Sequence, residues 1–178
     1  QVNMFVWMCL LAGFILAFPY ILWQIWSFIS PALYVNEKKN AKFFIFVSSL
    51  LFFSGVLFGY FILAPFSVTF LTSYNVSGLV EATATLSSYV DAMTMYTMAT
   101  GLVFEMPLAV YFLAKLGIMG PGFMKTYRRH AVVIILVLAA VITPPDITSM
   151  MVVTLPLLLL YELSIYIAAI YYPKDIPA

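Results

Sequence analysis

"MFVWMCLLAGFILAFPYILWQIWSF", residues 4–28, runs for 25 positions without one charged side chain. At 1.5 Å per residue, a helix of this length crosses the roughly 30 Å hydrocarbon core of a bilayer. The chain as a whole has the same character, because 65% of its 178 residues are hydrophobic and 8% are charged. Its mean hydropathy is +1.07, and an average soluble domain carries about 25% charged residues. The sequence therefore predicts an integral membrane protein.

Four further apolar stretches follow the first. The alternation of apolar and polar residues that marks the strands of a membrane barrel is absent. We therefore expect an all-α, polytopic helical bundle that forms a single transmembrane domain over residues 1–178. The spans are expected at about residues 4–28, 43–64, 89–114, 131–143 and 150–170.

Two features of these spans bear on the shape of the bundle. The fourth span is short, since about 13 residues of helix reach only about 20 Å, and it favours a locally thinner bilayer. Pro19, Pro107 and Pro156 lie inside spans. Each proline removes a backbone donor and tends to kink its helix, so the bundle is expected to be concave.

The basic residues of the connections predict the orientation. The second and fourth connections contain no Lys or Arg, so the positive-inside rule places the first and third in the cytoplasm, with the N-terminus outside and the C-terminus cytoplasmic. A chain that starts at Gln1 on the outer face without a signal peptide is expected to be a fragment that has lost a preceding helix. The basic residues are Lys38, Lys39 and Lys42 in the first connection, Lys115, Lys125, Arg128 and Arg129 in the third, and Lys174 in the tail.

Two acids lie within spans. Glu105, in "GLVFEMPLAV", is past the middle of the third span, where an ionised carboxylate must be protonated, paired or beside a wet cavity. It is either a functional intramembrane site or a neutral side chain hydrogen-bonded to a neighbouring helix, through backbone freed by Pro107. Glu162 lies nearer the cytoplasmic surface, and an interhelical hydrogen bond is expected there before a ligand.

The sequences of the two external connections predict different local structures. In "TPPDITS" the prolines stop one helix and Asp146 is expected to cap the next. In the longer second connection, Phe66, Phe70 and Leu71 fall on one side of a short helix. We expect that helix to lie in the interface plane as a cap over the bundle.

Residues of enzyme active sites are missing. His130 is the single histidine and Cys9 the single cysteine, so no His pair or disulfide can form, and there is no nucleophile elbow or phosphate loop. We expect no enzyme, no cofactor and no metal. The net charge of +1 gives no reason to expect a nucleic-acid partner.

Taken together, four segments resemble the TatC family, the multispan receptor subunit of the twin-arginine protein translocase, in order and spacing. The resemblance covers essentially the whole chain and implies a protein of six helices, of which the first is missing here. The segments are "FPYILWQIWSFISPALYVNEKK" (18–39), "LFGYFILAPFSVTFL" (57–71), "FEMPLAVYFLAKLGI" (104–118) and "ITPPDITSMMVVTLPLLLLYELSIY" (142–166).

The resemblance implies that Glu37, in the first cytoplasmic loop, recognises the paired arginines of a signal peptide. A carboxylate accepts the planar guanidinium fork bidentately, which a lysine of the cargo cannot reproduce. Lys38 and Lys39 belong to the same signal-binding loop, either as topology determinants or as contacts to anionic headgroups. The family's second acidic contributor, in its N-terminal cytoplasmic segment, is absent from this chain.

Glu105 matches the family's intramembrane glutamate, which implies a polar pocket that engages partner subunits or the inserted signal. The fourth and fifth spans resemble the family's docking surface for TatA-like and TatB-like single-span subunits. The possible docking or structural residues are Thr143, Asp146, Thr148, Thr154 and Glu162.

The function implied is that of a receptor core. It binds the twin-arginine signal peptides of folded precursors, assembles with itself and with partner subunits, and supports export driven by the proton gradient. We expect it in the lipid of a bacterial cytoplasmic (inner) membrane rather than a thylakoid. The alternative is a proton-coupled secondary transporter or channel with Glu105 as its relay, against which stand the lack of an internal repeat and of a second deeply placed acid.

Overall fold

A computed structural model describes residues 2–29, 41–73, 86–143 and 146–173. Every element in these ranges is helical, so the all-α class expected from the sequence is confirmed. The elements are α1 (Val2–Ile29), α2 (Ala41–Phe58), the π-helical η3 (Gly59–Leu63), α3 (Ala64–Ser73), α4 (Leu86–Val103), α5 (Met106–Lys115), α6 (Pro121–Thr126), α7 (Arg128–Ile142) and α8 (Ile147–Tyr171).

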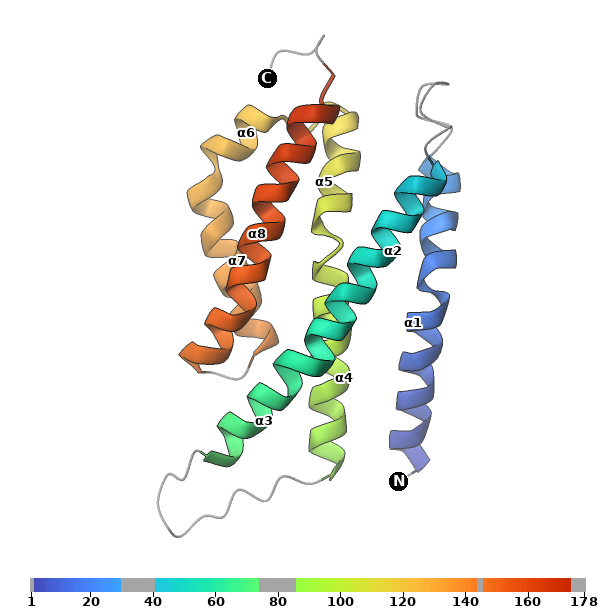
Figure 1. The fold of residues 1–178 in the computed structure, drawn as a ribbon, viewed down its shortest axis with the longest axis vertical. Coiled ribbons are helices and arrows are strands. Elements are labelled where there is room, and N and C mark those ends of the chain that lie inside the picture. Colours follow the sequence, from blue (N-terminus) through green and yellow to red (C-terminus); the bar gives the residue numbers. More distant parts are fainter. Residues whose placement is uncertain (1, 30–40, 74–85, 144–145, 174–178) are drawn as a thin grey trace.

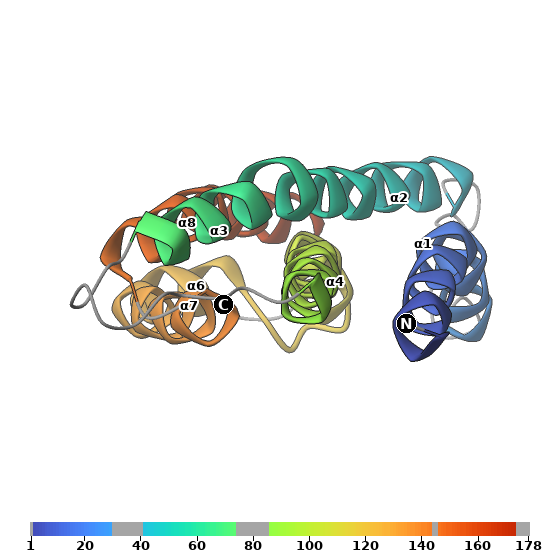
Figure 2. The same cartoon turned by 90° about the horizontal axis from the view of Figure 1, so that it is seen from below.

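The helices form two layers. The elements α2, η3 and α3 make one long diagonal line, and α4 and α5 make a second line through the middle of the molecule (Figure 1). Seen from below, α2, α3 and α8 lie in one layer, while α1, α4 and the pair α6 and α7 lie in the other (Figure 2). The most extensive packing is between α5 and α8 and between α2 and α4.

In the described part of the chain, four helical segments are long and apolar enough to cross a membrane. They are Met4–Phe28, Phe43–Thr69, Ser87–Lys115 and Ile147–Tyr171. The helix of the expected fourth span, α7, has 15 residues. This length corresponds to about 22 Å, which is short of a relaxed hydrocarbon core.

The second helix differs from the expectation. We expected it to end near residue 64 and a separate interfacial helix to follow, but the chain continues through η3 into α3 as far as Ser73. The π-helical turn η3 accommodates an extra residue between α2 and α3, so the helix continues without a break. Phe66 therefore lies on a continuation of the span, and the side chains of Phe70 and Leu71 lie outside the described part.

Two glycines explain how closely α2 and η3 approach α4. A Cβ atom on Gly55 would lie 2.7 Å from the carbonyl oxygen of Thr100. A Cβ atom on Gly59 would collide with Thr100 Oγ1 and lie 2.8 Å from the Tyr96 carbonyl oxygen. In turn, the Thr100 hydroxyl is shared between the carbonyl oxygens of Tyr96, at 2.6 Å in its own helix, and of Gly55, at 2.9 Å across the crossing. The crossing thus requires residues without a side chain, as in other membrane helix pairs built on small residues.

Pro107 accounts for the interruption between α4 and α5. It has no N–H to donate to the carbonyl of Val103, where α4 ends, and its ring crowds the same turn. The chain bridges the break with a turn in which the Leu108 N–H donates to the carbonyl oxygen of Glu105 at 3.0 Å. By contrast, Pro19 and Pro156 lie inside helices that remain continuous.

The packed interior has two parts. The larger joins η3, α3, α4 and α5 to α6, α7 and α8. The smaller holds α1 against α2, with the rings of Phe18 and Phe52 stacked at 3.5 Å between centroids and 10° between planes. Trp26 adds a ring contact to Phe44 at 4.9 Å. The first helix is therefore attached mainly by aromatic side chains, at the edge of the molecule (Figure 2).

Candidate functional site

Glu105 lies in the break between α4 and α5, as the N-cap residue of α5. The hydroxyl of Ser48, on α2, donates a hydrogen bond of 2.7 Å to Glu105 Oε2. The other carboxyl oxygen, Oε1, is buried and has no hydrogen-bond partner among the described residues. One half of the carboxyl group thus joins two helices, and the other half keeps its capacity to accept a hydrogen bond.

Glu105 also forms part of the wall of a cavity of about 580 Å³ between α4 and α5 on one side and α6 and α7 on the other. Cavities of this size hold small ligands or large side chains. The wall is mainly apolar, from Leu102 and Met106 to Ile134 and Leu138. Its groups with hydrogen-bonding capacity are the side chains of Glu105, Tyr127, His130 and Tyr161.

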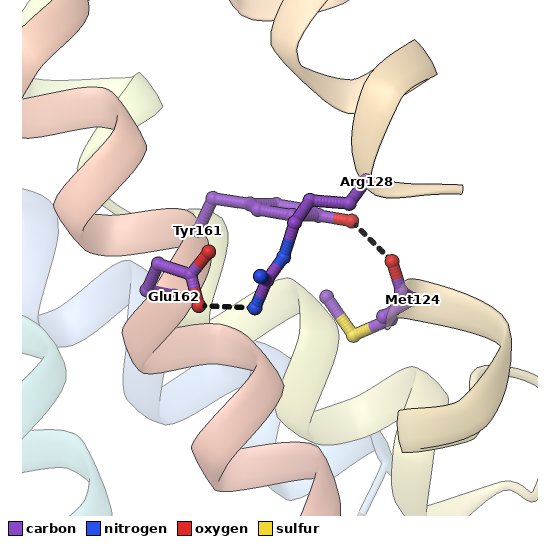
Figure 3. Close-up of polar contacts among 4 residues, drawn as sticks. All are labelled: Met124, Arg128, Tyr161 and Glu162. Carbon is purple, nitrogen blue, oxygen red and sulfur yellow. Dashed lines mark hydrogen bonds and ion pairs between the residues drawn. The ribbon is translucent and has the colours of Figure 1, made fainter. Parts of the chain in front are cut away.

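Two contacts join α6 and α7 to α8 (Figure 3), and Met124 and Tyr161, the residues of one of them, also line the cavity. Arg128 pairs with Glu162 at 2.8 Å, and the two side chains are 50% and 52% exposed. The buried hydroxyl of Tyr161 donates to the carbonyl oxygen of Met124 at 2.8 Å. Glu162 therefore has a partner on another helix.

The residues of the turn before α8 have structural roles in their own helices. Asp146 is the N-cap of α8, and its Oδ2 accepts from the Ser149 N–H at 2.6 Å. The hydroxyls of Thr143 and Thr154 are buried and donate to carbonyls of their own helices, at 2.9 Å and 2.7 Å. Thr148 is exposed, the only one of the three candidate threonines that is.

Glu37, Lys38 and Lys39 lie outside the described residues. The helix that precedes them, α1, ends at the same end of the bundle where α5 and α8 end and α2 begins (upper part of Figure 1). The described basic side chains, Lys115, Lys125, Arg128 and Arg129, belong to the elements at this end. Within the described ranges, no three His, Cys, Asp or Glu side chains form a group that could hold a metal ion.

A comparison with protein families matches residues 1–156 to the family "Sec-independent protein translocase protein (TatC)". The chain belongs to the TatC family. It is 44% identical over 168 residues to the TatC protein of Blattabacterium sp. subsp. Periplaneta americana (strain BPLAN), an alignment that covers 94% of this chain and 63% of that protein. With TatCy of Bacillus subtilis (strain 168) it shares 41% identity over 170 residues, or 96% of this chain and 67% of that protein.

The fold is also similar to that of a solved TatC. The structure described as "Crystal Structure of Twin Arginine Translocase Receptor- TatC" matches with a TM-score of 0.77 and 36% sequence identity, over 94% of this chain and 74% of that one. The chain thus spans about two thirds of the length of the TatC proteins it matches. The resemblance to the TatC family noted in the sequence is confirmed, and the chain is a membrane protein of several apolar helices.

The contacts of Gly55, Gly59 and Ser48 were not predicted from the sequence. The segment "GVLFG", residues 55–59, has the small-xxx-small spacing of packed membrane helices and was a usable signal for the crossing with α4. Ser48 carried no such signal. It lies 57 positions from Glu105 in the chain, and serines are common in membrane helices.

Proposed function

We propose that this chain is the receptor part of a twin-arginine protein translocase. It binds the signal peptides of folded precursor proteins at its cytoplasmic end and recruits single-span partner subunits through its helices. It does so without enzymatic chemistry, and export is driven by the transmembrane proton gradient. The names of its relatives, a Sec-independent protein translocase protein and a twin arginine translocase receptor, support this proposal.

The observation that carries the proposal is the position of Glu105. A half-satisfied carboxyl group in the wall of an apolar cavity is costly to maintain in a membrane, so it is expected to serve an occupant. The apolar wall suits the hydrophobic part of a signal peptide or one face of a partner helix. The carboxyl oxygen then accepts a hydrogen bond from a polar side chain of that occupant.

Recognition of the paired arginines is assigned to Glu37. A carboxylate binds one guanidinium through two parallel hydrogen bonds, so lysine in place of arginine keeps the charge and loses the geometry. Lys38 and Lys39 contact anionic headgroups beside the bound signal or act as topology determinants. The same proposal places this loop in the cytoplasm. It also includes the five expected spans and an N-terminus on the outer side of the membrane.

Partner subunits dock on α8 and α7 in this proposal. On α8 a stripe of exposed apolar side chains repeats every four residues, at Ile147, Met151, Leu155 and Leu159. Such spacing places the four side chains on one face of the helix. Thr148 adjoins this stripe, three positions before Met151, and offers a hydroxyl to a partner helix.

The membrane in which we propose that the protein acts is the cytoplasmic membrane of a bacterium.

The experiment is site-specific crosslinking in native membranes that contain the complete gene product. A photoreactive twin-arginine signal peptide is compared with its Lys-Lys form, on wild type and on Glu37→Ala, with Lys125→Gln as the charge control. We expect a crosslink to the first cytoplasmic loop that is lost with Glu37→Ala or with Lys-Lys and kept with Lys125→Gln. A crosslink that is indifferent to both changes would overturn the assignment of Glu37.

A second readout separates the receptor from a transporter. Glu105→Gln is expected to keep the crosslink near Glu37 and to stop export of twin-arginine precursors. If Glu105→Gln instead abolishes a proton-coupled solute uptake and leaves export intact, the receptor proposal fails and the transporter replaces it.

A further inference from the structure

The break between α4 and α5 lies between two cavities. Glu105 and Met106 line the cavity of about 580 Å³ that faces α6 and α7. Pro107 and Leu108 line a second cavity, of about 370 Å³, whose wall is formed by α2, α5 and α8. Figure 1 shows α5 between the upper parts of α2 and α8. The chain at the break therefore borders unfilled space on two sides.

The backbone at the break lacks two bonds of a continuous helix. In such a helix the N–H at position 107 donates to the carbonyl of Val103 and that of Leu108 to the carbonyl of Phe104. Pro107 has no N–H, and the Leu108 N–H donates instead to the carbonyl oxygen of Glu105, at 3.0 Å. The ψ angle of Glu105 is 0°, against about −42° in an α-helix. The chain can thus bend here at a lower cost in backbone hydrogen bonds than inside either helix.

The helices on the two sides of the break pack in separate groups. On one side, α4 packs mainly on α2 and η3, and α1 packs on α2. On the other side, α5 packs mainly on α8, which also contacts α6 and α7. We call α1, α2, η3, α3 and α4 the first unit, and α5, α6, α7 and α8 the second unit. The chain passes from the first unit to the second once, at Glu105.

The contacts between the units are less extensive than those within them. Rings of α1 and α2 meet rings of α5, among them Phe44 and Tyr111 at 4.3 Å between centroids. The larger packed interior continues across the boundary, but α4 meets α7 and η3 meets α8 over fewer residues than α5 meets α8. Both cavities lie on this boundary, because each is lined by residues of both units. Unfilled space permits displacements that a close-packed interior resists.

We propose that residues 104–107 form a hinge about which the second unit swings against the first. Hinges consist of a few residues at the ends of elements, which absorb the change in backbone angles. The swing changes the width of both cavities. A change of about 20° moves the far end of α5, about 15 Å from the break, by about 5 Å. The bond from Ser48 to Glu105 Oε2 ties α2 to the hinge and limits the swing. The hinge is independent of signal-peptide binding.

The test is double electron–electron resonance between pairs of spin labels in the complete gene product, in lipid nanodiscs without signal peptide and with Cys9→Ser. Labels at Phe28 on α1 and Tyr166 on α8 report the distance between the units. Labels at Phe28 and Leu57, and at Val141 and Tyr166, report distances within the first and the second unit. All four positions are exposed and line neither cavity. We expect the distribution between the units to be about 5 Å wider than the two others.

Two proline substitutions separate the hinge from general flexibility. Pro107→Ala supplies the missing N–H and is expected to narrow the distribution between the units to the width of the others. Pro156→Ala is the matched control, because Pro156 lies inside the continuous helix α8. It is expected to leave that distribution unchanged. Ser48→Ala removes the bond at the hinge and is expected to widen it.

Three results would overturn the hinge. They are a wild-type distribution between the units that is as narrow as those within them, an unchanged width in Pro107→Ala, and equal narrowing in both proline variants. Unchanged distances within the units show that a variant is folded. If Pro107→Ala does not fold, a wider distribution in Ser48→Ala supports the hinge and an unchanged one overturns it.

Discussion

The hydroxyl of Ser48 on α2 donates a hydrogen bond of 2.7 Å to Glu105, in the break between α4 and α5. Ser48 is 4% exposed, so this bond forms away from water. It joins a helix of one layer to a helix of the other at the point where Pro107 interrupts the backbone. This contact satisfies one oxygen of the carboxyl group, while the other, Oε1, is buried without a hydrogen-bond partner among the described residues.

We predict that Ser48→Ala destabilises the protein by about 1–3 kcal/mol, because a buried carboxyl group loses its donor. Unfolding in detergent, followed by circular dichroism, measures the change. In a Glu105→Met background the same substitution is expected to cost less, since no acceptor is left unsatisfied. Ser54→Ala is the control, because Ser54 is exposed and bonds only within its own helix. Equal costs in both backgrounds would show that the bond does not contribute.

Gly59→Ala is expected to destabilise the helix crossing by about 1–3 kcal/mol through overpacking. The new methyl group meets backbone atoms of Tyr96 and Thr97, at 2.8 Å and 2.9 Å, which cannot rotate away. Gly13→Ala is the matched control, since nothing lies within 4 Å of its Cβ position. That change is expected to be neutral or stabilising by up to about 1 kcal/mol. The thermal midpoints of both variants test the prediction, which fails if they move together.

The two contacts of Figure 3 are expected to contribute differently to the stability of the protein. Tyr161→Phe removes a buried hydroxyl from the Met124 carbonyl and is expected to cost about 0.5–1.5 kcal/mol. Glu162→Gln weakens the half-exposed pair with Arg128, which water and salt screen, and is expected to cost less than about 1 kcal/mol. Raising the salt concentration should reduce the second cost and leave the first unchanged. The reverse order of costs would contradict the burial argument.

Asp146→Ala is expected to destabilise α8 by about 0.5–2 kcal/mol, because the Ser149 N–H loses its acceptor. Asp146→Asn keeps a capping oxygen and is expected to retain most of the stability. Hydrogen exchange in the first turn of α8 resolves the effect locally. Faster exchange there in both variants alike would show that the charge, and not the cap, stabilises this end.

Several features were predictable because their causes are local in the chain. The absence of charge over 25 residues predicts a membrane helix, and a proline removes a donor wherever it stands. The cap at Asp146 follows from neighbouring residues alone, whereas of the three prolines within spans only Pro107 stands at a break in the helix. The continuation of α2 through η3 was missed, because the signal for it lies in the packing of Gly59 against another helix and not in the apolar run.

Contacts between helices could not be predicted from the sequence in the same way. In a soluble helix the apolar face shows which side is inward. Here α2 and α8 are apolar nearly all round, because lipid and protein interior are equally apolar surroundings. The sequence thus marked Glu105 and Glu162 as needing partners without naming Ser48 or Arg128.

The sequence by itself determined that this chain is a helical membrane protein of the TatC family, where its main apolar spans lie, and which acids are costly to bury. The tertiary structure decided which oxygen of Glu105 is bonded, how closely Gly55 and Gly59 approach Thr100, and where the two cavities open. The physical reason is distance along the chain. Hydropathy and backbone chemistry act within a few residues, whereas the rotation and crossing of helices depend on all packing contacts at once.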